Sequence, residues 1–314
     1  MTVRLRAVSR LQGNNAAVKS GAIAPEGYAL DWEEVPVLVD GFRRMVRELA
    51  YDVSEMALTT YLCAREHGVQ MTAIPVFLVR GFHHGAILVN RNAGIAHPRD
   101  LEGREVGVNR GYTVTTGVWV RAVLAEEYGV DLSKVTWVLS GDEHVADYVP
   151  PANVVPLPAG RKMGEDLASG RLVAAIGATT DSPDVGPLIA DAQAAGLAAF
   201  EARGHWPINH VIAVRNDVLA ANPGLGRALF EAFSASKRAY LDDLLAGRIA
   251  EPTAIDRLHA TLAPKMGGDP LPYGVEPNRQ VLETLIRHAT AQGILTKPVT
   301  VDEMFAPDTL GLVG

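Results

Sequence analysis

The stretch 79–85, Val-Arg-Gly-Phe-His-His-Gly, gathers an arginine and two histidines between two apolar runs. The planar guanidinium of Arg80 can hold a carboxylate through two parallel hydrogen bonds. His83 and His84 can each give or take a proton near neutral pH. Because neighbours on an extended chain point to opposite faces, at most one of these histidines is expected to reach a ligand. The stretch predicts a site that holds a small anion and moves a proton.

A second candidate site lies at residues 109–116, Asn-Arg-Gly-Tyr-Thr-Val-Thr-Thr, between a predicted strand and a predicted helix. The first N–H groups of a helix have no partner inside the helix, so they favour an anion. We expect Arg110 to bind a carboxylate here. Its neighbours are expected to line the same site: Tyr112, Thr115 and Thr116.

Further polar residues lie in three places: the stretch 140–144 follows the end of a predicted strand, where open parallel sheets bind their ligands, residues 209–210 precede the strand expected at 211–214, and residues 54–55 stand at a predicted helix start. We expect these residues to face the same cleft: Ser54, Glu55, Asp142, Glu143, His144, Asn209 and His210. Glu143, His144 or His210 could take a proton from a ligand hydroxyl. A structural alternative exists for the first two residues, because a serine suits an N-cap and an acid suits the first turn of the helix expected at 56–67.

Structural roles also stay open for other candidates. Arg80 and Arg110 could each pair with a structural carboxylate. His144 follows two acids, and its whole role could be to cap a helix. Cys63, the single cysteine, lies in an apolar segment and is expected to be a core residue. A metal site is not favoured, because no known ligand spacing joins its candidate ligands: His83, His84, Glu143, His144 and His210.

Strand-like and helix-like segments alternate along the chain, which favours an α/β fold with largely parallel sheets. Strands are expected at 3–8, 32–38, 71–79, 105–108, 135–139, 153–157, 172–176 and 211–214. Helices are expected at 42–49, 56–67, 115–128, 163–169 and 229–244, and around 282–286. At 314 residues the chain is long enough for two lobes, each with a core of its own.

Composition and missing motifs exclude several classes of protein. A formal net charge of −7 offers no basic surface for nucleic acid. No apolar run approaches the length of a membrane span, and the N-terminus lacks the apolar segment of a secretory signal, so we expect a cytoplasmic protein. The sequence contains no P-loop, no dinucleotide-binding glycine motif, no G-x-S-x-G, no H-E-x-x-H and no C-x-x-C.

The remaining candidates are rich in carboxylate binders and proton carriers and poor in nucleophiles. Such residues suit the decarboxylation of an aromatic acid. In that reaction a ring hydroxyl pushes electron density to the carboxyl-bearing carbon, an acid protonates this carbon, and CO2 leaves as the ring regains aromaticity.

Four stretches of the sequence also resemble the 4,5-dihydroxyphthalate decarboxylase family. They are 52–61 (Asp-Val-Ser-Glu-Met-Ala-Leu-Thr-Thr-Tyr), 75–84 (Pro-Val-Phe-Leu-Val-Arg-Gly-Phe-His-His), 107–117 (Gly-Val-Asn-Arg-Gly-Tyr-Thr-Val-Thr-Thr-Gly) and 140–145 (Ser-Gly-Asp-Glu-His-Val). Pro-Ile-Asn-His at 207–210 continues the likeness, which covers most of residues 1–245.

The resemblance implies a two-lobed fold like that of type II periplasmic binding proteins, with the ligand cleft between the lobes. Carried onto this chain, lobe 1 would comprise residues 1–88 and 208–314, and lobe 2 would comprise residues 89–207. The two crossings between the lobes would lie near 85–91 and 208–214.

The resemblance further implies conversion of 4,5-dihydroxyphthalate to protocatechuate and CO2, without an organic cofactor. Arg80 and Arg110 would bind the substrate carboxylates with help from the helix start at 115–116, and His83 or His84 would protonate the ring carbon. Ser54 and Glu55 would line the opposite lobe. The family label is broad, so another hydroxylated aromatic acid also stays open as the substrate.

Two other functions remain open on the same fold. One is a non-catalytic protein that binds an aromatic carboxylate, and the other is a metal-dependent lyase. The sequence leaves the oligomeric state open, a homo-oligomer included.

Overall fold

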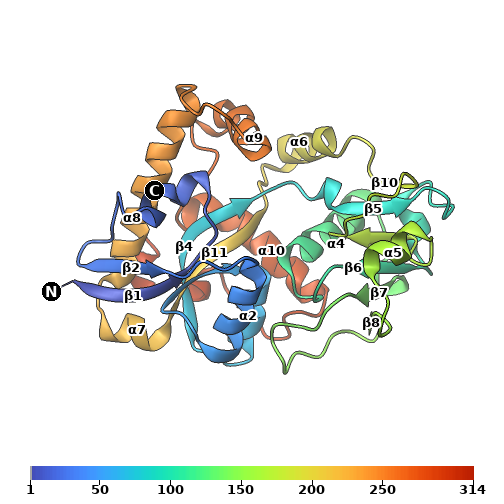
Figure 1. The fold of residues 1–314 in the computed structure, drawn as a ribbon, viewed down its shortest axis with the longest axis horizontal. Coiled ribbons are helices and arrows are strands. Elements are labelled where there is room, and N and C mark those ends of the chain that lie inside the picture. The colour runs from blue at the N-terminus through green and yellow to red at the C-terminus, as the bar shows by residue number, and fades with distance from the viewer. Residues whose placement is uncertain (1) are drawn as a thin grey trace.

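The computed structural model describes residues 2–314 as two α/β halves that lie side by side (Figure 1). The first half contains a five-stranded sheet in the order β2-β1-β3-β11-β4, formed by β1 (Val3–Val8), β2 (Tyr28–Trp32), β3 (Val53–Ala57), β4 (Met71–Arg80) and β11 (Ile208–Arg215). The second half contains a six-stranded sheet in the order β10-β5-β9-β6-β7-β8, formed by β5 (Ile87–Asn90), β6 (Glu105–Val108), β7 (Thr136–Leu139), β8 (Val154–Pro156), β9 (Ala174–Ile176) and β10 (Val185–Pro187).

Most neighbouring strands run parallel, and one strand in each sheet runs against the others. In the five-stranded sheet this strand is β11, which is antiparallel to both β3 and β4. In the six-stranded sheet it is β5, which is antiparallel to β9 and β10. The predicted α/β class with largely parallel sheets is therefore confirmed. Pro75 lies in β4, which is an edge strand, so its missing N–H breaks no hydrogen bond between interior strands of the sheet.

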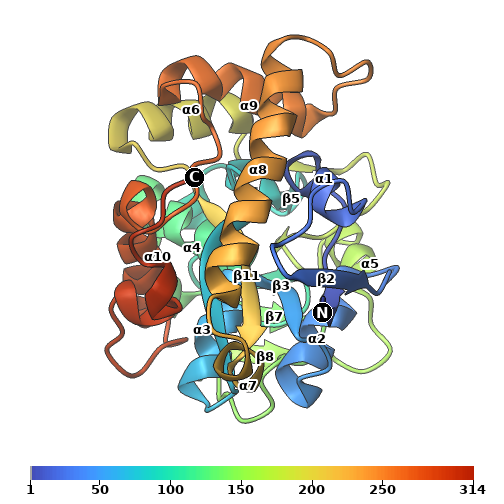
Figure 2. The same cartoon turned by 90° about the vertical axis from the view of Figure 1, so that its left-hand side faces the viewer.

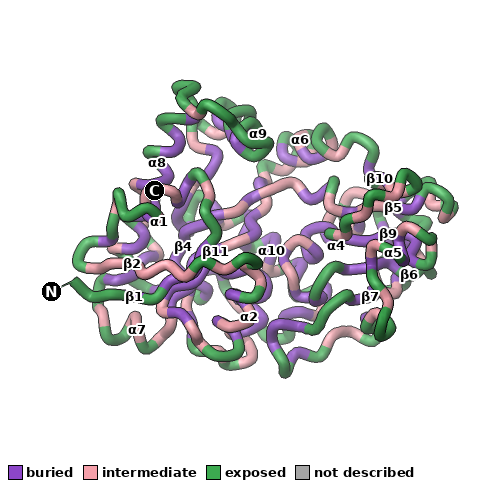
Figure 3. Tube along the Cα trace, in the orientation of Figure 1, coloured by how far each residue is buried: buried purple, intermediate pink, exposed green. Residues whose placement is uncertain are grey.

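The helices cover the faces of these sheets. They are α1 (Ala16–Lys19), α2 (Leu38–Glu48), α3 (Leu58–Glu66), α4 (Thr115–Tyr128), α5 (Met163–Ala168), α6 (Ala192–Arg203), α7 (Asn216–Ala221), α8 (Leu225–Leu245), α9 (Ala254–Leu262) and α10 (Arg279–Ala291). Figure 2 shows the long helix α8 running along the five-stranded sheet, and Figure 3 shows buried residues on inner strands such as β11 and on the helices that pack against the sheets. Cys63 is fully buried, as expected of a core residue, and burial raises the pKa of its thiol to about 12.

Two local predictions are wrong. The strand expected at 32–38 is β2 at Tyr28–Trp32, and α2 already begins at Leu38. Ser54 is not an N-cap, because it lies inside β3, a strand whose residues are all buried between β1 and β11. Its hydroxyl donates to the Glu55 carbonyl within the strand, and α3 starts only at Leu58. Pairing on both edges of β3 outweighs the local capping preference.

The chain passes from one sheet to the other twice. The first passage is the segment 81–86 between β4 and β5, and the second is the segment 204–207 between α6 and β11. The predicted crossings at 85–91 and 208–214 fall mostly on β5 and β11, which are integral strands of their sheets, so a lobe boundary at 88/89 would cut β5. Within residues 2–314, no helix has the length and apolar character to cross a membrane.

Candidate active site

A cavity of about 310 Å³ lies between the two halves, at the carboxyl ends of β1, β3, β6 and β7. We call it the central cavity. It combines two arginines, two histidines and a threonine with an apolar wall, and its lining residues are Arg10, Pro36, Val37, Leu38, Val39, Phe42, Ala57, Arg110, Val114, Thr116, His144 and His210. Both halves of the molecule contribute to it, as the strand-end pattern predicts for this kind of sheet.

The two arginines of the central cavity come from opposite halves. Arg10 follows β1, and its backbone N–H donates to the Glu55 carboxylate at 3.0 Å. Arg110 follows β6, and its backbone N–H donates to the Ser140 hydroxyl at 2.7 Å. Among residues 2–314, neither guanidinium forms an ion pair or a side-chain hydrogen bond. Two uncompensated cations therefore face one cavity, which suits a ligand with two anionic groups.

His210 is held in the cavity by a buried carboxylate. Its Nδ1 lies 2.6 Å from Oε1 of Glu55, a fully buried residue of β3 that pairs with β11. Burial by itself would raise the pKa of Glu55, but the hydrogen bonds and charge of His210, together with the Ser9 hydroxyl and the Arg10 N–H, hold this pKa below its ordinary value. The carboxylate fixes the ring of His210 and leaves Nε2 as the nitrogen for a ligand.

His144 is the second imidazole of the central cavity. It is buried, and its Nδ1 has no hydrogen-bond partner in the described part of the chain. Burial, with smaller contributions from the charges of Arg43, Arg110 and Arg47, lowers its pKa to about 4. At neutral pH His144 is therefore a neutral ring that can accept a hydrogen bond at one nitrogen and donate one at the other.

An apolar surface closes the central cavity on the side of α2. Val37, Leu38 and Val39 form it at the start of the helix, and Phe42 follows one turn later. The ring of Phe42 meets the ring of His210 edge-on, with 5.2 Å between their centroids. This surface suits the face of an aromatic ring and leaves the polar groups to fix its orientation.

Glu143 has a structural position and does not line the cavity. Its carboxylate accepts from the backbone N–H groups of Tyr112 and Thr113 and from the Thr113 hydroxyl, and it thereby organises the loop that carries Arg110. A Cβ at Gly111 would come within 2.5 Å of this carboxylate, so a larger residue there would push the Glu143 side chain from its place. The expected role of Glu143 in taking a ligand proton is replaced by this role in shaping the loop.

Of the remaining candidates in the 110–116 stretch, one lines the central cavity and two are buried in contacts outside it. Thr116 lines the cavity, and its hydroxyl accepts from the Asn209 side chain at 3.2 Å. Thr115 is buried and bonded to Thr59 of α3. The buried ring of Tyr112 stacks on the Arg121 guanidinium, with 3.8 Å between them, and does not line the cavity.

Arg80, the first candidate for binding a carboxylate, lies outside the central cavity. Its guanidinium is buried and donates to the carbonyls of Trp206 and Pro272 and to the side chain of Asn278. Burial lowers its pKa to about 9. Arg80 thus anchors the end of β4 to the C-terminal part of the chain, and its hydrogen-bonding capacity is largely used there.

The two adjacent histidines also do not line the central cavity. Nε2 of His83 lies 2.8 Å from Oδ1 of Asn209, and burial lowers the pKa of His83 to about 4. His84 pairs with Glu127 of α4 at 2.8 Å. Asp142 does not line the cavity either, because its exposed carboxylate pairs with arginines of α2. The structure therefore brings together Arg110, Thr116, His144 and His210 in the central cavity, backed by Glu55 and Asn209, and the other candidates do not line it.

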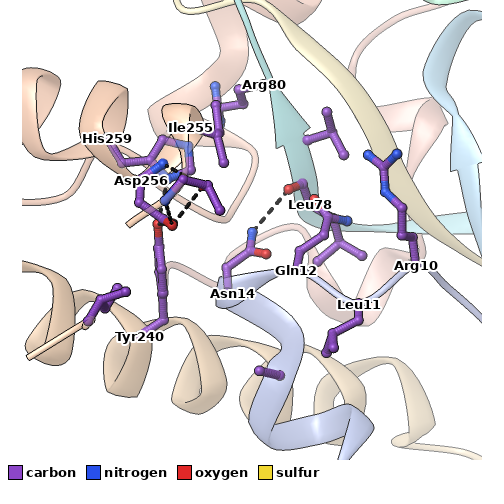
Figure 4. Close-up of a pocket in the computed structure, with 15 residues that line it drawn as sticks. Arg10, Leu11, Gln12, Asn14, Leu78, Arg80, Tyr240, Ile255, Asp256 and His259 are labelled. Atoms are coloured by element: carbon purple, nitrogen blue, oxygen red, sulfur yellow. Dashed lines mark hydrogen bonds between the residues drawn. The ribbon is translucent and has the colours of Figure 1, made fainter. Parts of the chain in front are cut away.

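A larger cavity, of about 630 Å³, adjoins the central one at Arg10 (Figure 4). It lies between the loop after β1, the end of β4 and the helices α8 and α9, so it belongs to the first half alone. In it the Tyr240 hydroxyl donates to Asp256 at 2.5 Å and lies 2.9 Å from Nδ1 of His259. Arg10 is the residue common to both cavities.

No metal centre is apparent from the side chains. In the range 2–314, no three His, Cys, Asp or Glu side chains gather so that they could hold an ion. The histidines proposed as metal ligands are divided between the central cavity and the passages between the sheets.

Arg10 is the functional candidate that sequence reasoning missed. It stands two residues after the strand Val3–Val8, the same position relative to a strand that marked Arg110 after β6. The signal was present in the sequence, but a lone arginine beside a polar loop is less conspicuous than a cluster of arginine and histidines. The apolar wall from α2 was missed because 32–38 was interpreted as a strand.

Comparisons with known proteins support the fold and give the family. No protein-family model matches the chain. Its fold is similar to that of the periplasmic aliphatic sulphonate binding protein SsuA from Escherichia coli, with a TM-score of 0.54 and 14% identity over 99% of both chains. It is also similar to the desulfurization enzyme DSZB, with a TM-score of 0.52 and 17% identity over 98% of this chain and 97% of that one. The predicted periplasmic-binding-protein-like fold is thus confirmed.

Two curated relatives carry the same name. A 4,5-dihydroxyphthalate decarboxylase from Comamonas testosteroni is 32% identical over 286 residues, which cover 86% of both chains. A second 4,5-dihydroxyphthalate decarboxylase, from Pseudomonas putida, is 35% identical over 168 residues, which cover 49% of this chain and 65% of the relative. With the first likeness extending over most of its length, the chain belongs to the 4,5-dihydroxyphthalate decarboxylase family.

Proposed function

We propose that the protein is a cofactor-independent decarboxylase that converts 4,5-dihydroxyphthalate to protocatechuate and CO2. The observation that carries the proposal is the meeting of two uncompensated arginines with the His210–Glu55 pair in one cavity between the halves. The names of both curated relatives point to the same reaction. A cytoplasmic location fits the proposal and stays a prediction.

The arginines bind the substrate in this proposal. Arg10 and Arg110 each take one of the two neighbouring carboxylates, and the ring rests against Phe42 and the start of α2. Because adjacent carboxylates on a ring repel and crowd each other, gripping them from opposite halves can turn one of them out of the ring plane. A carboxylate in that orientation can leave as CO2, since the breaking bond overlaps with the ring π system.

His210 supplies the proton. Its protonated form, paired with the Glu55 carboxylate, donates from Nε2 to the carboxyl-bearing ring carbon. The bond between this carbon and the carboxylate then breaks, its electron pair restores the aromatic ring, and CO2 leaves. His210 regains its proton from solvent. The dianionic substrate and one proton thus give a monoanionic product and CO2.

His144 increases the electron density of the ring. The hydroxyl para to the departing carboxylate donates a hydrogen bond to the neutral imidazole of His144, whose pKa of about 4 keeps it unprotonated at neutral pH. This bond draws the hydroxyl proton away and strengthens electron donation to the carbon that accepts the new proton.

The test is CO2 release from 4,5-dihydroxyphthalate by the purified protein, measured with and without a chelator. Release that survives chelation supports the cofactor-independent reaction. Release that is lost on chelation and restored by a divalent metal would replace it with a metal-dependent lyase. Tight binding of the acid without release would favour the non-catalytic binding protein. If the protein neither binds the acid nor releases CO2 from it, 4,5-dihydroxyphthalate is excluded as the substrate.

A further inference from the structure

Two arginines on one face of α2 hold a loop of the other half of the molecule. Arg43 and Arg47 are one helical turn apart on this helix, and both reach Asp142 in the loop that follows β7. Nη1 of Arg43 lies 2.7 and 2.6 Å from the two carboxylate oxygens, and Nη2 of Arg47 lies 2.9 Å from one of them. In Figure 1 this loop descends from β7 toward α2.

Arg47 also binds the backbone of the same loop. Its Nη2 donates to the Glu143 carbonyl at 2.8 Å, and its Nε donates to the His144 carbonyl at 3.1 Å. The guanidinium therefore contacts three consecutive residues, and the last of them is the histidine that lines the central cavity. A lysine could not reproduce this set of contacts, because the fork of an arginine fixes the directions of its donors.

Helix α2 contributes both to the wall of the central cavity and to the contacts that hold the 142–144 loop. Its first turns provide the apolar wall of the central cavity through Leu38, Val39 and Phe42, and its next turn provides the two arginines. Contacts within about three turns of one helix thus include both the apolar wall of the central cavity and the anchor of the loop that carries His144.

We propose that Arg43 and Arg47 are positioning residues for the reaction, which hold the 142–144 loop against α2 so that His144 faces the ring hydroxyl of the bound substrate. The role assigned to His144 rests on the proposed function, whereas the holding of the loop does not. Single exposed ion pairs contribute little to stability, so the arginines are expected to affect the geometry of the site far more than the stability of the fold.

The helix itself offers a matched control. Arg44 lies between the two arginines in sequence but pairs with Glu33 and the Tyr51 hydroxyl, both in its own half. Arg44→Ala removes the same kind of side chain from the same helix, and it leaves the 142–144 loop untouched.

The first arm of the test needs no substrate. Hydrogen–deuterium exchange is followed over residues 140–146 in the full-length wild type, in the double variant Arg43→Ala/Arg47→Ala, and in Arg44→Ala. We expect faster exchange of this segment in the double variant, by about tenfold or more, with wild-type exchange in the control. Unchanged exchange in the double variant would overturn the proposal.

The second arm measures decarboxylation by the same variants. The double variant should lose kcat by about 100-fold, because a displacement of about 1 Å at a reacting group has an effect of this size, while KM changes much less. Arg44→Ala should keep both constants. A loss confined to KM would overturn the positioning role and assign the arginines to attraction of the anionic substrate.

The pH profile distinguishes positioning from a general loss of structure. The charges around His144 are Arg43 and Arg47 on α2, Arg110 on the loop after β6, and Asp142 on its own loop. Removing the two arginine charges should raise the pKa of His144 and move the acid limb of kcat to higher pH, and an unmoved limb would contradict the proposal. If the wild type itself releases no CO2, the proposed function fails, and hydrogen exchange alone decides whether the arginines hold the loop.

Discussion

The hydrogen bond between His210 and Glu55 joins residues that are 155 positions apart in the sequence. It forms because β11 returns from the second half and pairs with β3, which sets His210 opposite Ala57 and close to Glu55. Three further donors surround the carboxylate, from Ser9, the Arg10 backbone and Gln12, so its charge is stabilised without solvent. A buried carboxylate with these partners is a fixed acceptor, and it holds the ring of His210 in one orientation.

Replacing Glu55 by glutamine tests this pairing. Glu55→Gln keeps the size of the side chain but removes the negative charge, so His210 loses the charged partner that orients its ring. We expect kcat to fall about 100-fold with little change in KM, measured by CO2 release. Glu127→Gln serves as the control, because Glu127 pairs with His84 outside the central cavity, and this variant should keep full activity. Wild-type kcat in Glu55→Gln would remove the pair from the mechanism.

Arg110 combines an exposed charge with a strained backbone. Its φ is +71°, in the left-handed region that costs an ordinary residue about 1 kcal/mol or more and costs glycine little. The loop keeps an arginine there although a glycine would fit more easily, and this is understandable if the side chain has a function.

Two variants separate the backbone of Arg110 from its charge. Arg110→Gly should raise the free energy of unfolding by about 0.5–1 kcal/mol, and Arg110→Ala should leave it nearly unchanged, as measured by urea denaturation. Both should raise KM about 10- to 100-fold, because each removes one charge-assisted carboxylate contact. If KM stays at the wild-type value in both, Arg110 does not bind the substrate.

At the scale of elements, β4 depends on an anchor at its end. Arg80 closes the strand by binding the carbonyls of Trp206 and Pro272 and the side chain of Asn278, which belong to the second passage and to the C-terminal part of the chain. Its guanidinium also lies 5.5 Å from the centre of the Phe77 ring. The anchor joins three segments that are distant in sequence, so its removal affects the fold before it affects the chemistry.

Arg80→Ala is therefore expected to behave as a stability variant. Loss of the guanidinium leaves several buried acceptors without donors, and we expect the free energy of unfolding to fall by about 2–4 kcal/mol. KM of the folded fraction should remain near that of the wild type. Arg104→Ala, at an exposed arginine with one carbonyl contact, provides the comparison. A normal melting temperature together with a tenfold higher KM would return Arg80 to the substrate site.

At the scale of the whole molecule, three buried histidines couple folding to pH. Burial is the main cause that lowers the pKa of His83, His144 and His259, each to about 4. An unfolded histidine titrates near pH 6.5, so between about pH 4 and pH 6.5 the unfolded chain binds more protons than the folded one. Stability is therefore full above pH 6.5 and is lost as the pH falls toward 4.

Urea unfolding at pH 7 and pH 5 measures this coupling. We expect the free energy of unfolding to be lower at pH 5 by about 1–2 kcal/mol for each of the three histidines. His259→Asn should lose less between the two values than the wild type does, because one titrating group is gone. His97→Asn, at an exposed histidine, should lose as much as the wild type. Equal losses in all three proteins would show that the buried histidines are not the cause.

The sequence by itself determined the fold class, the family and much of the cleft. Alternating apolar segments specify the strands, and polar residues at their ends gather at one edge because parallel strands share a direction. This reasoning brought Arg110, Thr116 and His144 to a common cleft, whereas Glu55 and His210 were candidates by residue type and through the family resemblance. These predictions depend on local periodicity and on the geometry of parallel sheets, both of which are readable along the chain.

Only the tertiary structure decided which strand-end residues face the central cavity. Arg80 turns away because its acceptors come from Pro272 and Asn278, about two hundred positions later, and Glu143 turns inward because unpaired N–H groups of the 112–113 loop meet it there. Arg10 faces the cavity because Glu55 binds its backbone. The side chains of Arg80 and Glu143 lie where their hydrogen bonds are satisfied, and their partners are far away in sequence, so no local pattern could have shown them.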